Sequence, residues 1–270
     1  METDCTMTWI SGTEFCQKKE VQVYLNSLLE CGFDGKKLVF TNDMPKDFRL
    51  DIEAKGFNVV DVPATEVEDI NRDRHYAYYK YLSKHTDFRY VLITDSKDVL
   101  FQENPILFVG LAYGSQFIML VDEGLLHKES WYNSESQKDL QSRLRAFKTD
   151  FNEWQVVNAG VMLGTVDKLK LLLLNTWMST FALSSKCGDQ AGLNFAYRLL
   201  TEDAFIFLNH PKDSVFCATG EGMNVGTYAP KPIWNNDKLT HADLKLPYCL
   251  FHQWDRTAYA ADILRRYAKC

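Results

Sequence analysis

The stretch Tyr90–Asp98, with the sequence YVLITDSKD, joins a continuous apolar and β-branched run to a short polar segment. The run itself, Tyr90–Thr94, predicts a central strand of a parallel sheet, because such strands are buried on both faces. In open α/β sheets, ligands bind beyond the carboxyl ends of the strands. Asp95 and Asp98, which come after this strand, therefore stand where a functional site is expected.

Strand and helix patterns alternate on both sides of this stretch. The predicted strands cover residues 6–10, 37–40, 57–62, 116–121, 155–164, 205–208 and 248–252. Helical spacing of apolar residues predicts helices over 21–29, 47–55 and 67–82, after residue 164, near residue 189 and at the end of the chain. The βαβαβ order of the first half predicts a Rossmann-like α/β fold, in which helices flank a mostly parallel sheet.

The length of 270 residues suits one α/β domain over residues 1–270, alone or within a longer chain. A formal charge of −6 argues against a protein that wraps nucleic acid, because such proteins need a basic surface. No signal peptide is recognised, and apolar runs such as Leu171–Leu174 are too short to span a bilayer. We expect no transmembrane segment and a cytoplasmic protein, in the host cytoplasm if the source is viral.

The cysteines do not suggest a structural role for disulfides or zinc. The seven cysteines are an odd number and include no CxxC pair, so neither a disulfide framework nor a zinc site is indicated.

The segment 125–150 is polar and irregular, and it is predicted to form a lid or a surface excursion.

Asp95 and Asp98 are candidate metal ligands. Two carboxylates at the end of one buried strand repel each other unless a cation lies between them. Mn²⁺ and Mg²⁺ are typically held by one or two protein carboxylates together with substrate phosphate oxygens. His252, at the end of the last predicted strand, is a candidate third ligand. The alternatives are that an aspartate caps a helix near Pro105 or lies in a turn, and that the histidine only makes a hydrogen bond.

Three other segments carry candidate site residues. Gly160, two residues after Asn158 in a predicted strand, suggests that the backbone approaches a ligand closely, or else a β-bulge. Asp189 and Gln190 open a helix, where an acidic residue also suits the helix dipole. Arg256 could supply a cation to a departing diphosphate, although a surface arginine is the alternative.

Together these motifs resemble those of the GT-A glycosyltransferases. The matching segments are 90–101 with its DxD-like Asp95 and Asp98, 157–164 (VNAGVMLG), Asp189-Gln190 with Asn194, and 251–256 (FHQWDR). The pattern is most similar to the retaining branch that includes glycogenin and the bacterial lipopolysaccharide galactosyltransferases, and it also resembles the DxD glycosyltransferases of large algal viruses. The chain departs from the family in having two residues between its aspartates, and in lacking the family's His, Gly, Lys-Pro-Trp ending.

The resemblance implies metal-dependent transfer of a sugar from a nucleoside-diphosphate sugar, a UDP-sugar, to a hydroxyl of a glycan or glycoconjugate, with retention. Asp98, Asp95 and His252 would hold Mn²⁺ or Mg²⁺. The implied donor-binding residues are Asp95, one of Arg72 and Arg74, Asn158, Ala159, Gly160 and Arg256. Gln190 matches the weakly basic amide of retaining relatives, and Asp189 is the competing catalytic candidate.

Two other functions remain open. A sugar-nucleotide nucleotidylyltransferase shares the fold and the use of a metal, but it usually carries a glycine-rich basic loop after the first strand. The segment 11–14 (SGTE) is not such a loop. A noncatalytic module that binds nucleotide sugars is the second alternative, and donor binding without turnover would favour it.

Overall fold

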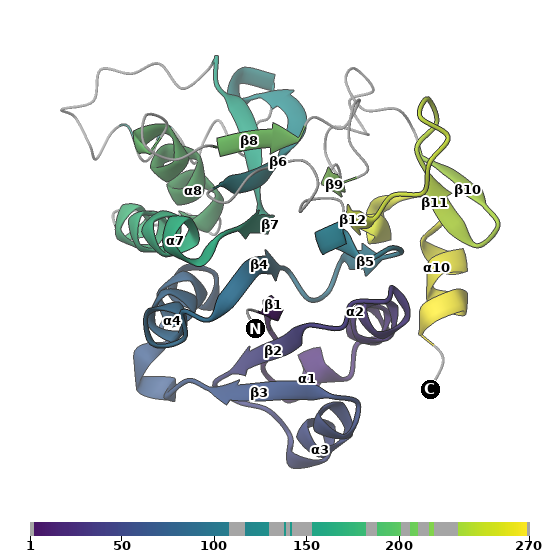
Figure 1. The fold of residues 1–270 in the computed structure, drawn as a ribbon, viewed down its shortest axis with the longest axis horizontal. Coiled ribbons are helices and arrows are strands. Elements are labelled where there is room, and N and C mark those ends of the chain that lie inside the picture. The colour runs from purple at the N-terminus through teal and green to yellow at the C-terminus, as the bar shows by residue number, and fades with distance from the viewer. Residues whose placement is uncertain are drawn as a thin grey trace.

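The computed structural model describes residues 3–107, 117–129, 138, 141, 153–181, 188–200, 206–209, 216–218 and 232–268. A seven-stranded sheet lies at its centre, in the order β3-β2-β1-β4-β7-β6-β8 (Figure 1). Its strands are β1 (Thr3–Trp9), β2 (Lys36–Thr41), β3 (Phe57–Asp61), β4 (Phe88–Thr94), β6 (Ile118–Leu126), β7 (Gln155–Gly164) and β8 (Ile206–Asn209).

The direction of β7 decides which residues meet at the functional edge of the sheet. Strands β3, β2, β1 and β4 are mutually parallel, as are β6 and β8. Strand β7 runs antiparallel to both β4 and β6, with Thr94 opposite Val161 and Asp122 opposite Val157. The first half of β7 therefore lies beside the carboxyl ends of β4 and β6. The predicted mostly parallel α/β sheet is confirmed, with β7 as the exception.

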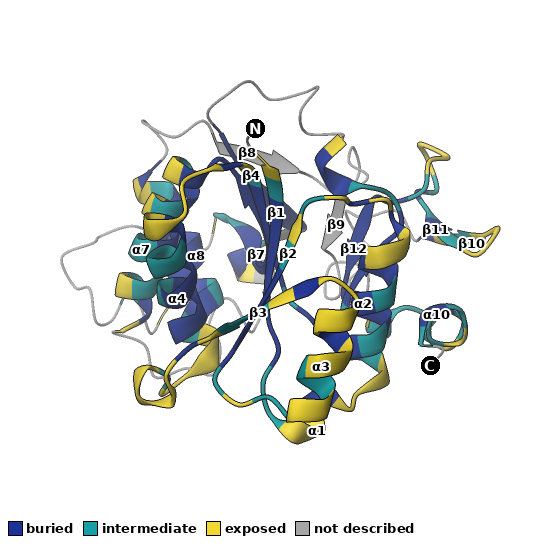
Figure 2. Cartoon of the chain, turned by 60° about the horizontal axis from the view of Figure 1, so that its bottom comes forward, coloured by how far each residue is buried: buried dark blue, intermediate teal, exposed yellow. Residues whose placement is uncertain are grey.

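Helices cover both faces of the sheet (Figure 2). They are α1 (Thr13–Cys16), α2 (Lys19–Glu30), α3 (Lys46–Ala54), α4 (Ile70–Lys84), α7 (Val166–Thr180) and α8 (Gly188–Leu199). Side chains alternate between the faces, as strand geometry requires. Val91 and Ile93 of β4 belong to the core under α4, α7 and α8, whereas Leu92 belongs to the core under α2 and α3. This double burial explains the continuous apolar run of β4.

A second, three-stranded sheet carries the C-terminal part of the chain to the same edge. It consists of β5 (Val99–Phe101), β12 (Leu250–His252) and β9 (Phe216–Ala218), in the order β5-β12-β9. The remaining elements are β10 (Ile233–Asn235), β11 (Lys238–Thr240), η1 (Ala64–Glu66), η2 (His127–Glu129), η3 (Trp254–Arg256) and α10 (Ala260–Tyr267). A separate apolar cluster that includes Leu100, Phe251 and Trp254 anchors this part against α2.

Most predicted elements are confirmed, with shifts at their ends. Strand β5 was missed because it has only three residues and directly follows the polar motif. Strand β6 continues to Leu126, into the segment 125–150 that was predicted as a lid or a surface excursion. Most of the rest of that segment lies outside the described residues. No helix in the described ranges is long and apolar enough to cross a membrane.

Candidate active site

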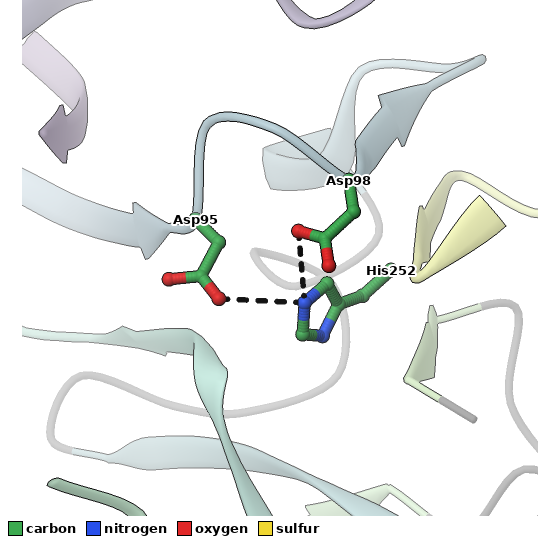
Figure 3. Close-up of side chains that lie close together, drawn as sticks. All are labelled: Asp95, Asp98 and His252. Atoms are coloured by element: carbon green, nitrogen blue, oxygen red, sulfur yellow. Dashed lines mark ion pairs between the residues drawn. The ribbon is translucent and has the colours of Figure 1, made fainter. Parts of the chain in front are cut away.

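Three potential metal ligands converge beyond the carboxyl end of β4 (Figure 3). The Nε2 atom of His252 lies 3.5 Å from Oδ2 of Asp95 and 3.3 Å from Oδ1 of Asp98. One ligand atom from each residue lies within 4.8 Å of the others. The sequence predicted these three residues as a metal site. In the fold they lie side by side, although the two aspartates are far from the histidine along the chain.

Strand pairing explains why His252 meets the aspartates. Strands β12 and β5 are antiparallel with His252 opposite Val99, the residue after Asp98. The chain then turns sharply at Gln253, which has a left-handed φ of 63°. This conformation is uncommon for a residue other than glycine and costs about 1–3 kcal/mol. It lets the Gln253 N–H donate to the Asp98 carbonyl at 2.6 Å, which holds the two sides of the site together.

Gly160 forms the floor of the triad. Its carbonyl accepts a hydrogen bond of 2.9 Å from the Asp95 N–H, so β7 passes directly beneath the site. A Cβ atom at position 160 would lie 2.3 Å from Cε1 and 2.7 Å from Nε2 of His252, and 2.7 Å from Oδ2 of Asp95. Only glycine leaves the space in front of these ligand atoms open. Gly164 differs, because a Cβ there would meet the Phe117 carbonyl in the core.

The charges of the triad are strongly coupled. Burial alone would lower the pKa of the His252 imidazole, but Asp98 and Asp95 more than offset this and raise the pKa to about 10. Burial alone would raise the pKa of the Asp95 carboxyl, yet Arg74 and His252 hold it well below its usual range. Without a metal, a proton on His252 therefore compensates the two carboxylates.

Arg74 links the triad to the start of α8. Its Nη1 donates to Oδ1 of Asp95, and its Nη2 donates to Oδ2 of Asp189 at 3.0 Å. The second oxygen of Asp189 accepts from the Gln190 N–H at 2.8 Å. Burial raises the pKa of the Asp189 carboxyl above its usual range, and Arg74 offsets only part of that rise. Both Asp189 oxygens thus have partners within the protein.

The structure places Arg72 and Arg256 outside this cluster. Arg72 points to the other side of α4, where it pairs with Asp73 and Glu68 and lies 4.7 Å from the ring centroid of Phe181. Arg256 is exposed on η3. Neither arginine is among the residues that line the cavities described below.

A buried carboxylate that the sequence reading missed lies behind the site. Glu123, near the end of β6, accepts hydrogen bonds through Oε1 from Nδ2 of Asn158 at 2.7 Å and from Nε2 of Gln190 at 3.1 Å. Oδ1 of Asn158 accepts in turn from the Gly160 N–H at 2.7 Å. The rule that identified Asp95 applies here too, because Asp122 and Glu123 are polar residues after an apolar strand run.

Two adjoining cavities open at the triad. A cleft of about 700 Å³ lies on one side and is lined by Trp9, Ser11, Phe15, Glu68, Asp69, Ile70, Asn71, Arg74, Asp95, Ser96, Lys97 and Asp98. A smaller hollow of about 190 Å³ lies on the other and is lined by Asn71, Arg74, Asp95, Asn158, Ala159, Gly160, Asp189, Gln190, His252 and Gln253. Asn71, Arg74 and Asp95 line both, so the two spaces meet there. The hollow contains most of the residues predicted to bind the donor.

The triad fits a divalent cation. Two carboxylates and one imidazole form a ligand set suited to Mn²⁺ or Mg²⁺. Among the described residues Nε2 of His252 faces only the two carboxylates and Nδ1 has no hydrogen-bond partner, although the residue is only 2% exposed. A buried imidazole of this kind requires compensation. The space that Gly160 leaves open lies in front of Nε2 of His252 and Oδ2 of Asp95.

Comparisons with known proteins bear on the fold. No protein-family model matches the chain, and no curated protein matches its sequence. Among solved structures, it is similar to an active-site mutant of LgtC with a glutamine-to-glutamate change, at a TM-score of 0.61. It is also similar to the galactosyltransferase LgtC in complex with donor and acceptor sugar analogues, at a TM-score of 0.59. In both cases the identity is 14%, and the match covers 98% of this chain and 95% of the other. The predicted GT-A fold is therefore confirmed.

Proposed function

We propose that this chain is a glycosyltransferase that moves a sugar from a UDP-sugar to a hydroxyl of a glycan or glycoconjugate, with Mn²⁺ or Mg²⁺ and with retention. The observation that carries the proposal is the position of Asp95, Asp98 and His252 where a large cleft meets a small polar hollow. A nucleotide sugar consists of a nucleoside, a diphosphate that binds cations, and one sugar ring. These three parts match the cleft, the triad and the hollow. The likeness of the fold to LgtC supports the same reading.

The larger cleft suits the nucleotide. Trp9 and Phe15 line it and offer aromatic surface for a base, while Lys97 adds a positive charge beside the motif. The side chain of Lys97 is 40% exposed and lies 3.3 Å from Asp255. We expect Lys97 to be free to turn from this ion pair toward a phosphate, because exposed pairs are weak.

The bond that breaks joins the anomeric carbon to the β-phosphate oxygen, and its electron pair leaves with the phosphate. Asp95, Asp98 and His252 would hold the cation, which supplies Lewis-acid stabilisation of that departing charge. Arg74 keeps Asp95 ionised and in place. The new bond joins the acceptor oxygen to the anomeric carbon, and the acceptor proton passes to the departing phosphate.

Gln190 is the residue we place beside the anomeric carbon. It lines the small hollow together with Ala159 and Gly160. An amide oxygen there would stabilise positive charge at that carbon without acting as a base. Asp189 is the weaker candidate, because Arg74 and the Gln190 N–H engage its two oxygens. A glutamine also lies in the active site of LgtC, because the similar structure is an active-site mutant of LgtC in which a glutamine is changed to glutamate.

Product analysis tests the proposal and separates it from its alternatives. The enzyme with Mn²⁺, a UDP-sugar and an acceptor should yield a nucleoside diphosphate by ³¹P NMR and a product with the donor's anomeric configuration by ¹H NMR. Pyrophosphate would indicate a nucleotidylyltransferase instead. Donor binding without turnover would indicate a noncatalytic module. Inversion would move the catalytic role to Asp189 or another acidic residue.

A further inference from the structure

Glu123 connects the two amide side chains that line the sugar-sized hollow. It lies near the end of β6, is 3% exposed, and accepts from Asn158 on β7 and from Gln190 on α8 through the same oxygen, Oε1. The contact therefore joins three elements behind the hollow. Nothing in the proposed chemistry uses Glu123 directly, because the hollow's lining does not include it.

The chemistry of a carboxylate fixes the orientation of both amides. Oε1 of Glu123 accepts from both amides, so each amide turns its NH₂ group toward Glu123. For Asn158 the opposite end is fixed as well, since its Oδ1 accepts from the Gly160 N–H at 2.7 Å. For Gln190, the oxygen and nitrogen diverge from the same carbon at about 120°, as in any planar amide. Its Oε1 is therefore directed away from Glu123.

We propose that Glu123 is a positioning residue that presents the carbonyl oxygen of Gln190, rather than its NH₂ group, to the anomeric carbon. This inference rests on the proposed role of Gln190. The orientation matters because positive charge grows on a sugar ring as its glycosidic bond breaks. A carbonyl oxygen stabilises such a charge, whereas an NH₂ group at the same place destabilises it. Removing Glu123 removes the acceptor that turns the Gln190 NH₂ group away from the hollow.

Two substitutions at Glu123 distinguish the loss of the hydrogen-bond acceptor from a change in side-chain shape. Glu123→Met removes the acceptor while keeping a chain of similar length in a buried position. Glu123→Gln keeps one neutral acceptor oxygen, so it should rescue part of the function. Tyr197→Phe is the matched control: Tyr197 lies on α8, is 2% exposed, and bonds the Gln155 carbonyl rather than Gln190. Melting temperatures identify any variant that fails to fold, and Glu123→Gln then carries the test.

The first measurement does not depend on activity. In ¹⁵N-labelled protein, the Gln190 NH₂ resonance is assigned by its loss in Gln190→Ala, and its hydrogen exchange is followed. We expect exchange to become at least about ten-fold faster in Glu123→Met, the loss of roughly one hydrogen bond of 1.4 kcal/mol, and to stay unchanged in Tyr197→Phe. Equal exchange in wild type and Glu123→Met would overturn the proposal.

The second measurement is a double-mutant cycle on UDP-galactose or UDP-glucose turnover with Mn²⁺. We expect Glu123→Met to lower kcat by about 10–100-fold with little change in KM for the donor, and Glu123→Gln to lie between it and wild type. In the Gln190→Ala background the same change should cost less than about three-fold. An equal cost in both backgrounds would contradict the coupling. If Gln190→Ala alone leaves kcat unchanged, the proposed role of Gln190 fails instead.

Discussion

Gly160 lies so close to His252 that a Cβ atom would come within 2.3 Å of the imidazole Cε1. We predict that Gly160→Ala weakens Mn²⁺ binding at least about ten-fold, because the methyl group would fill the space in front of the ligand atoms. Calorimetric titration of Mn²⁺ measures this. Gly164→Ala is the control, since its Cβ would meet the Phe117 carbonyl and should cost stability but not metal affinity. Unchanged affinity in Gly160→Ala would place the cation elsewhere.

Arg74 and Arg72 are neighbours in sequence, but their environments predict different losses. Arg74 is 9% exposed and pairs with the half-buried Asp95 and the buried Asp189, so Arg74→Ala takes the guanidinium away from both carboxylates. We expect a loss of about 3–5 kcal/mol in the free energy of unfolding. Arg72→Ala should cost about 1 kcal/mol or less, because backbone N–H groups of Glu68 and Asp69 also bond Asp73. Urea denaturation measures both, and equal losses would contradict the difference.

The raised pKa of His252 predicts a loss of stability at high pH when no metal is bound. The folded-state pKa of about 10 lies above the ordinary value of about 6.5. The folded state therefore binds an extra proton between these values, so the stabilisation is complete below about 6.5 and is lost as pH rises through about 10. Urea unfolding in chelator from pH 7 to pH 10 should show a steeper decline for wild type than for His252→Gln. Equal slopes would show that His252 is not protonated in the fold.

Position in the sheet made much of the site predictable from sequence. Asp95 and Asp98 follow a strand whose continuous apolar run marks it as central, and His252 ends another apolar strand. Gly160 was recognisable because glycine weakens a strand and needs a reason. These residues follow from rules that link a residue type to a place in the fold. Such rules do not require the distances between residues.

The remaining features depend on information that local patterns do not contain. An apolar run does not show strand direction, so the reversal of β7 was not predictable. Arg72 and Arg74 lie about 200° apart around a helix, but the pattern did not say which one faces the sheet edge. Glu123 was missed because the predicted strand ended at Val121. It belongs to the site only through its contacts with Asn158 and Gln190.

Metal-dependent sugar transfer is tested by the rate of nucleoside diphosphate release from UDP-galactose, UDP-glucose and their N-acetyl forms, measured with Mn²⁺ and again after chelation. The comparison includes Asp98→Asn and, as a control, Asp167→Asn on the exposed side of α7. We predict release from at least one donor, and a loss of about 100-fold or more on chelation and in Asp98→Asn, because charge on the departing phosphate would go uncompensated. The control should match wild type. Full turnover after exhaustive chelation, or in Asp98→Asn, would contradict metal-dependent transfer at this site.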